Sequence, residues 1–101
     1  MHPINDPSML TLRDGLEFQK KGQLLQAEAM YREVLRAQPE HATALHLLGI
    51  VLAQTGRPHE AVDFLYRSAT LRPHDAVNLH NLAGSLHATG ALEEALQASQ
   101  K

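Results

Sequence analysis

The stretch that decides the fold is Leu45-His46-Leu47-Leu48-Gly49-Ile50-Val51-Leu52-Ala53-Gln54-Thr55-Gly56. Between Leu45 and Leu52 its apolar and small residues recur at spacings of i, i+3, i+4 and i+7, which place them on one face of an α-helix. Gly56 then ends the helix, because glycine takes the left-handed conformation after a helix without a Cβ clash. The stretch therefore predicts an amphipathic helix that is followed by a tight turn.

The same pattern occurs three times with a period of 34 residues. It returns later in the chain as Leu79, Leu82, Ala83, Leu86 and Gly90. A weaker copy comes earlier, as Thr11, Asp14, Gly15, Phe18 and Gly22. A second helix follows each glycine and carries a small residue at an equivalent place, namely Ala27, Ala61 and Ala95. Pro39 and Pro73 stop the second helices, since proline lacks an N–H and disfavours helix at the preceding residue. A regular period of this length indicates stacked helical units.

Six helices are predicted, at about residues 8–21, 24–37, 42–55, 58–71, 76–89 and 92–100. Their connections are only a few residues long, so consecutive helices must run antiparallel as hairpins. Each hairpin leaves an apolar face that its neighbour covers, which predicts an all-α solenoid. Residues 1–7 form a loose lead-in, and Ser8 is the expected N-cap of the first helix. We divide the remainder into repeats at 8–41, 42–75 and 76–101, the last of them truncated.

Composition and charge exclude several classes of function. The net charge of the 101-residue chain is −2, and the charges are scattered, so no basic stripe suits a nucleic-acid backbone. Cysteine is absent, which excludes disulfides and thiolate metal sites. The N-terminus does not resemble a signal peptide, and no segment has the roughly 20 apolar residues of a membrane span. We expect a cytoplasmic protein that acts without a membrane or nucleic acid.

The 34-residue helix-turn-helix pattern resembles the tetratricopeptide repeat over residues 8–101. The residues that carry the resemblance are Leu48, Gly49, Leu52, Gly56, Ala61, Leu65 and Pro73. It implies a right-handed solenoid whose first helices line a concave groove that holds peptides or helices. The stretches 45–61 and 81–83 are also similar to the N-terminal repeat arrays of bacterial proteins that often carry a glycosyltransferase domain.

The family's groove positions can be carried over residue by residue. The partner-binding residues that the resemblance implies are Leu12, Leu16, His46, Leu47, Ile50, Val77, His80, Asn81 and His87. For Leu16 and Ile50 the alternative is that they merely extend the core. Repeats that clamp a C-terminal carboxylate use lysine, arginine and asparagine at set places, and here those places hold Leu12, Leu16, Leu47 and Val77. An amphipathic or apolar segment is therefore the better ligand.

The seven histidines raise the possibility of a metal site, which their spacing does not support. His80 and His87 lie two turns apart on one helix, about 11 Å. Zinc needs its ligand nitrogens about 2 Å from the metal, so we predict no metal and no cofactor. Histidines that titrate between about pH 5 and pH 7 offer pH-sensitive binding as a milder alternative. No nucleophile elbow or phosphate-binding loop is present, so we predict that the chain is not an enzyme.

The sequence thus predicts a non-catalytic protein–protein interaction module. Asn81 is expected to hold the main chain of a peptide, with His46 and His80 at the edge of the site. One alternative is the substrate-recruiting N-terminal part of a larger glycosyltransferase-like enzyme. Asn81 matches the asparagine that such arrays use to hold a substrate backbone, whereas Leu47 at the equivalent place does not. The other alternative is self-assembly, as a homodimer, through Leu92, Ala95 and Leu96, which no following helix covers.

Overall fold

The computed structural model describes residues 7–90, which form five helices. These are α1 (Pro7–Lys20), α2 (Leu24–Ala37), α3 (Ala42–Gln54), α4 (Pro58–Leu71) and α5 (Ala76–Thr89). They match five of the six predicted helices to within a residue, and the sixth, at 92–100, lies outside the described residues. The predicted cap is wrong: α1 begins at Pro7, so Ser8 lies inside its first turn. Proline is well tolerated there, because its missing N–H would have no partner in a first turn.

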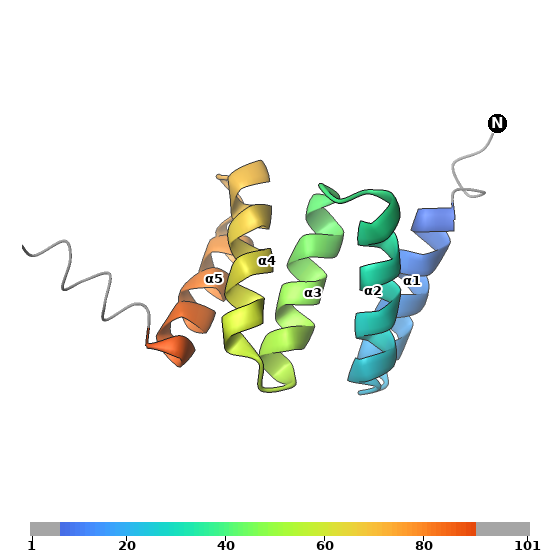
Figure 1. The fold of residues 1–101 in the computed structure, drawn as a ribbon, viewed down its shortest axis with the longest axis horizontal. Helices are drawn as coiled ribbons and strands as arrows, with labels where there is room; N and C mark the ends of the chain where they lie inside the picture. The colour runs from blue at the N-terminus through green and yellow to red at the C-terminus, as the bar shows by residue number, and fades with distance from the viewer. Residues whose placement is uncertain (1–6, 91–101) are drawn as a thin grey trace, which may run out of the picture.

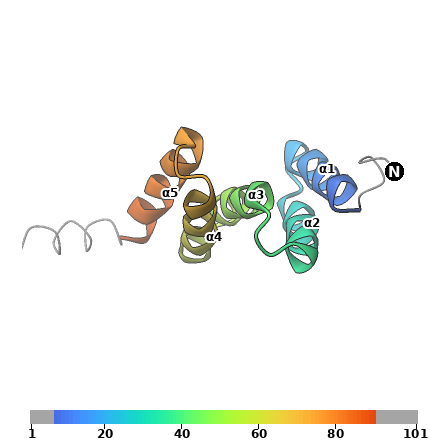
Figure 2. The same ribbon diagram turned by 90° about the horizontal axis from the view of Figure 1, so that it is seen from above.

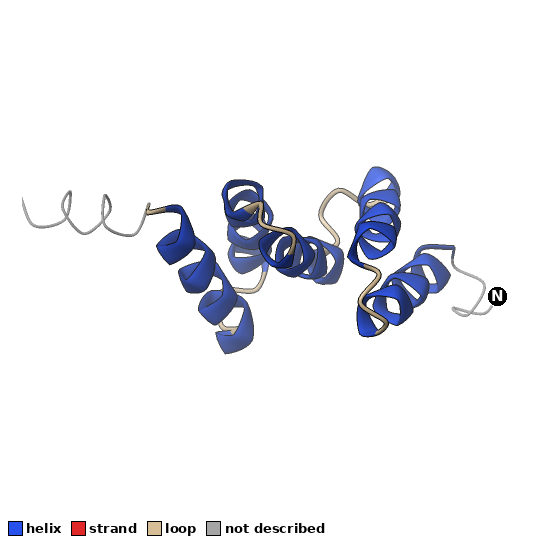
Figure 3. Cartoon of the chain, turned by 90° about the horizontal axis from the view of Figure 1, so that it is seen from below, coloured by secondary structure: helices blue, strands red, loops and turns tan. Residues whose placement is uncertain are grey.

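The helices stand side by side in one row, and each runs antiparallel to the helix before it (Figure 1). The row measures 55 × 27 × 21 Å. Seen from above, α2 and α4 lie on one side of the row and α1 and α5 on the other, with α3 between them (Figure 2). We call the side of α2 and α4 the second-helix side, and the side of α1 and α5, together with the part of α3 that contacts α5, the first-helix side. Among residues 7–90 only helices and short loops occur, which confirms an all-α helical repeat solenoid (Figure 3).

Glycine ends each first helix as predicted. Gly22, Gly56 and Gly90 have φ angles of 76°, 78° and 78°, in the left-handed region. No other residue of the described range has a positive φ. The three glycines reverse the chain at equivalent places, so the 34-residue spacing of the sequence becomes a regular spacing of turns.

The core lies between the helices of the second repeat and extends into the first. Its fully buried members are Ala27, Tyr31, Leu48, Val51, Leu52, Ala61 and Leu65. α3 and α4 approach closely because Gly49 has no side chain: a Cβ there would lie 2.5 Å from Leu65 Cγ. Leu45, Leu48 and Leu52 are buried, as the deciding stretch predicts. In the third repeat the equivalent Leu79 is 45% exposed.

Candidate partner-binding site

The predicted groove residues all lie on the first helices, but they differ in how far they are exposed. Leu12 and Leu47 are partly buried and pack against the core, and Ile50 is half-buried. Leu16 and Val77 are 38% and 63% exposed. His80 and His87 are exposed, whereas His46 and Asn81 are half-buried. Among the predicted groove residues, accessible apolar surface therefore comes mainly from Leu16 and Val77.

A chain of hydrogen bonds joins α3, α4 and α5. Asn78 is buried at the start of α5, where its Nδ2 donates to Ser68 Oγ at 2.8 Å. The Ser68 hydroxyl donates in turn to the carbonyl of Ala42 at 3.1 Å. His46 Nδ1 lies 2.7 Å from Asn78 Oδ1, and Asn81 Nδ2 lies 3.4 Å from His46 Nε2. Asn81 is thus tied to the interior through His46.

The donors and acceptors in this series of hydrogen bonds follow from the buried Asn78. Because Asn78 uses its Nδ2 on Ser68, it presents its carbonyl Oδ1 to His46, which must then donate from Nδ1. In the neutral ring Nε2 is consequently the acceptor, and it faces the amide nitrogen of Asn81. Among residues 7–90 nothing else bonds the Asn81 side chain, so its Oδ1 and one N–H remain available to a ligand.

Sequence reasoning missed Asn78 and Ser68. Ser68 is fully buried and hydrogen-bonded, and the pattern of the repeats did not single it out. One signal was present: these two polar residues replace Ala44 and Val34, which stand 34 positions earlier. Two polar residues at buried positions must pair with each other or lose hydrogen bonds.

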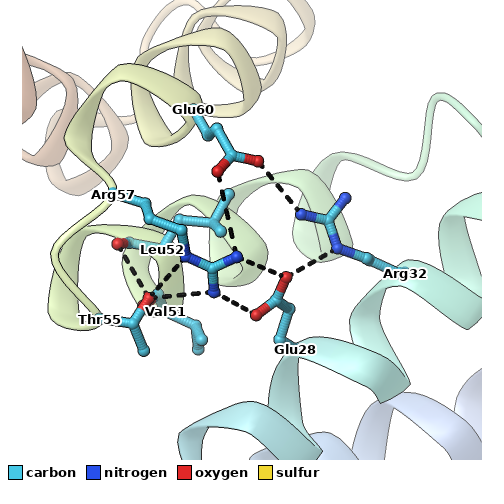
Figure 4. A network of polar contacts seen from close by, with 7 residues as sticks. All are labelled: Glu28, Arg32, Val51, Leu52, Thr55, Arg57 and Glu60. Atoms are coloured by element: carbon cyan, nitrogen blue, oxygen red, sulfur yellow. Dashed lines mark hydrogen bonds and ion pairs between the residues drawn. The ribbon is translucent and has the colours of Figure 1, made fainter.

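On the second-helix side a charged cluster joins the first two repeats (Figure 4). Glu28 on α2 is nearly buried and accepts from Arg57 through both carboxylate oxygens, with Arg57 Nη1 at 3.1 Å. It also accepts from Arg32 Nε at 2.9 Å, while Glu60 lies 3.5 Å from Arg32 and 4.0 Å from Arg57. Thr55 Oγ1 accepts from Arg57 as well, at 3.2 and 3.3 Å.

The cluster shifts the pKa of both central groups. The hydrogen bond from Arg57 lowers the pKa of Glu28, against the opposing effect of burial. The same bond raises the pKa of Arg57. Both groups therefore stay charged in the fold, and Glu28 bridges α2 to the turn that precedes α4.

The described range offers neither a metal-binding cluster nor a membrane-spanning helix. Residues 7–90 hold no group of three or more histidine or carboxylate side chains that could bind a metal ion. None of the five described helices has the length and hydropathy that crossing a membrane requires. Leu92, Ala95 and Leu96, the predicted self-association residues, lie outside the described part of the chain, and their role stays a prediction.

Comparisons with known proteins agree with the architecture. The sequence profile of the tetratricopeptide repeat matches residues 12–76. An O-GlcNAc transferase mutant from Thermobaculum terrenum is 30% identical over 93% of this chain, with a TM-score of 0.83. The MamA protein is 23% identical over 94% of the chain, with a TM-score of 0.82, and a MamA point mutant is 26% identical over 94%, with a TM-score of 0.80. No curated relative matches the sequence.

The chain spans 18% of the length of the transferase structure, 52% of MamA and 69% of the MamA mutant. The structural likeness to MamA at 23% identity shows the fold alone. The family profile, in contrast, matches well over half of the chain. Tetratricopeptide repeats generally mediate protein–protein interaction, and their fold is typically non-catalytic. By sequence profile and by architecture, the chain belongs to the tetratricopeptide repeat family.

Proposed function

We propose that the chain is a non-catalytic module that binds a peptide or helical segment of a partner protein on its first-helix side. The observation that supports this most is the hydrogen-bond chain that ends at Asn81. It holds one amide N–H inward and leaves an acceptor and a donor for the ligand. A peptide main chain offers both complementary groups whatever its side chains are.

The surroundings of Asn81 suit a backbone that approaches closely. Val77 and Gly84 lie four residues before and three residues after Asn81, so the three share one face of α5. Val77 supplies exposed apolar area. A Cβ on Gly84 would meet nothing within 4 Å, so the space beside this backbone is open. His80 is exposed on the same helix and stands at the edge of the proposed site.

The proposal is tested with peptides selected from a random library against the whole chain. The best binder is titrated by calorimetry against wild type, Asn81→Ala and, as a control on α2, Gln26→Ala. Loss of one hydrogen bond should weaken binding of Asn81→Ala by about 1 kcal/mol, roughly fivefold. Thermal melting should stay close to wild type. A library binder that responds to Gln26→Ala and not to Asn81→Ala would refute the site.

A second candidate function has a specific observation in its favour. The transferase from Thermobaculum terrenum is similar to this chain over 93% of the length of this chain. Asn81 also matches the asparagine expected of substrate-holding arrays. We infer that in a longer protein the same surface would hold a polypeptide for an enzyme domain. The two functions can be separated by placing a photoreactive residue at position 77 of the full native protein. The crosslinked proteins are then identified by mass spectrometry. Capture of modified substrates supports enzyme recruitment, and capture of an unmodified stable partner supports the binding module.

A further inference from the structure

The second-helix side carries a hollow of about 360 Å³ between α2 and α4. Its apolar lining comes from Leu35, Leu48 and Phe64. Pro39 and three arginines, Arg32, Arg36 and Arg67, complete the lining, which contains no carboxylate. The hollow therefore combines an apolar floor with a positively charged rim.

The three guanidinium groups are held in different ways. Arg32 and Arg67 lie over the ring of Phe64, with Cζ atoms 5.6 and 5.5 Å from its centroid, within the range of cation–π attraction. Glu28 and Glu60 orient Arg32 further. Arg67 donates from Nη2 to the carbonyl of Pro39 at 3.1 Å and forms no ion pair within residues 7–90. Its charge is thus fixed in place without a neutralising carboxylate.

Arg36 is available for exchange. It pairs with Glu33 at 3.2 Å, but the two side chains are 74% and 60% exposed. An ion pair in such surroundings is worth little, so a ligand carboxylate can replace Glu33 at small cost.

A second hollow of about 310 Å³ adjoins the first and shares Pro39 and Arg67 with it. Its lining includes Tyr66 and Leu71, which are 64% and 42% exposed, and one carboxylate, Glu40. Arg67 therefore stands between two hollows that both have apolar walls. Tyrosine and arginine are the residue types that most often dominate the energy of protein interfaces.

We propose that these two hollows form a docking surface for an acidic segment of a partner protein in which aliphatic side chains stand beside carboxylates. Charge complementarity supports this occupant: Arg36 and Arg67 bind the carboxylates, and the apolar walls bind the aliphatic side chains. A wholly apolar segment would remove water from the guanidinium groups without offering them a hydrogen-bond acceptor, which is unfavourable. The surface lies across the row from Asn81, so it is independent of the site proposed above.

The test uses the complete chain and a fluorescein-labelled peptide, acetyl-ELEELEEL-amide, whose binding is followed by fluorescence anisotropy. Arg67→Glu should weaken binding by about tenfold or more, because a charge-assisted hydrogen bond is lost and a repulsion is added. Arg13→Glu, the same charge change at an exposed position on α1, should change it by less than about twofold. Equal losses in both variants would mean non-specific charge attraction and would overturn the site.

Two further comparisons keep the proposal falsifiable if Arg67→Glu proves unstable. Tyr66→Ala removes apolar area without changing charge, and it should weaken binding measurably while Asn81→Ala leaves it unchanged. Peptides with glutamine for glutamate, or with alanine for leucine, should each lose most of the affinity, and retention by either one would refute the combined recognition. Backbone amide shifts should cluster around Phe64 and Arg67, whereas shifts around Asn81 would place the acidic peptide on the first-helix side instead.

Discussion

The ring of Tyr31 on α2 lies directly against the backbone of Gly15 on α1. A Cβ on Gly15 would come within 2.5 Å of Tyr31 Cε1 and 2.9 Å of Cδ1. The Tyr31 hydroxyl also donates to Gln19 Oε1 at 2.6 Å, one turn further along α1. The two helices of the first hairpin are thus fixed in distance by a missing side chain and in register by a hydrogen bond.

Gly15→Ala should destabilise the fold. Alanine favours helix over glycine by about 0.5–1 kcal/mol, but overpacking a core costs about 1–3 kcal/mol, and a fully buried ring cannot move aside. Gly84→Ala is the matched control, because its Cβ would meet no atom within 4 Å and should raise stability by about 0.5–1 kcal/mol. Urea unfolding followed by circular dichroism measures both. A stabilised Gly15→Ala protein would mean that α1 and α2 are further apart than described.

Ala61→Leu should also lower stability, by about 1–3 kcal/mol, since Ala61 is fully buried between α3 and α4. Ala53→Leu on the exposed side of α3 makes the same chemical change without overpacking. Thermal melting of the two variants compares them. If both melt like wild type, the second hairpin has room that the structure does not show.

Stability should fall in acid because of Glu28. Its pKa in the fold lies below the ordinary value of 4.5, so its contribution is complete above about pH 4.5 and is lost as the pH falls through the lowered folded pKa. Glu28→Gln removes this contribution at every pH. The melting temperature of wild type should therefore fall more steeply between about pH 6 and pH 3 than that of Glu28→Gln. Parallel curves would show that the cluster contributes nothing to pH dependence.

Tyr31 predicts the opposite trend in alkali. Burial raises its pKa from 10.0 to about 12, so the folded state retains a proton that the unfolded state loses. Its contribution is complete below pH 10 and is lost as the pH rises toward 12. Tyr31→Phe cannot ionise, and its stability should decline less than that of wild type over this range. Denaturant midpoints at increasing pH provide the measurement.

Asn78 and Ser68 should show strong coupling. Asn78→Ala removes the partner of His46 Nδ1 and leaves the buried Ser68 hydroxyl without a donor, which should cost about 1–3 kcal/mol. Ser68→Val with Asn78→Ala restores the apolar pair, Val34 and Ala44, that stands at the equivalent places of the preceding junction between repeats. The double variant should lose clearly less stability than the two single losses together, by a double-mutant cycle of unfolding free energies. Simple additivity would show that the two side chains act separately.

The fold was predictable because it rests on features that recur. The left-handed turns require glycine at positions 22, 56 and 90, and close helix packing requires it at position 49. Each requirement therefore appears in the sequence as a glycine at a fixed position of the 34-residue period. The site was less predictable because it rests on features that do not recur. Asn78 and Ser68 differ from the apolar residues at the equivalent positions of the repeat. An interpretation based on the period alone takes such differences to be tolerated substitutions.

Surface chemistry was hidden for a different reason. Arg32 and Arg67 are 35 positions apart and read in the sequence as solvated charges. Only the fold, which sets α2 and α4 on the same side of the row, places both over Phe64. Likewise, the helical face of Leu12 and Leu47 does not reveal that both pack against the core.

The two junctions between repeats are held by different pairs of residues. The repeats are therefore not interchangeable, and the fold depends on their order. The first junction needs Glu28 to meet Arg57, whereas the residue equivalent to Glu28 in the next repeat is Val62. The second needs Asn78 to meet His46, whereas the residue equivalent to Asn78 one repeat earlier is Ala44. A duplicated middle repeat would set Arg57 beside a valine and His46 beside an alanine. Evolution can therefore lengthen this array by copying only if compensating substitutions accompany the copy.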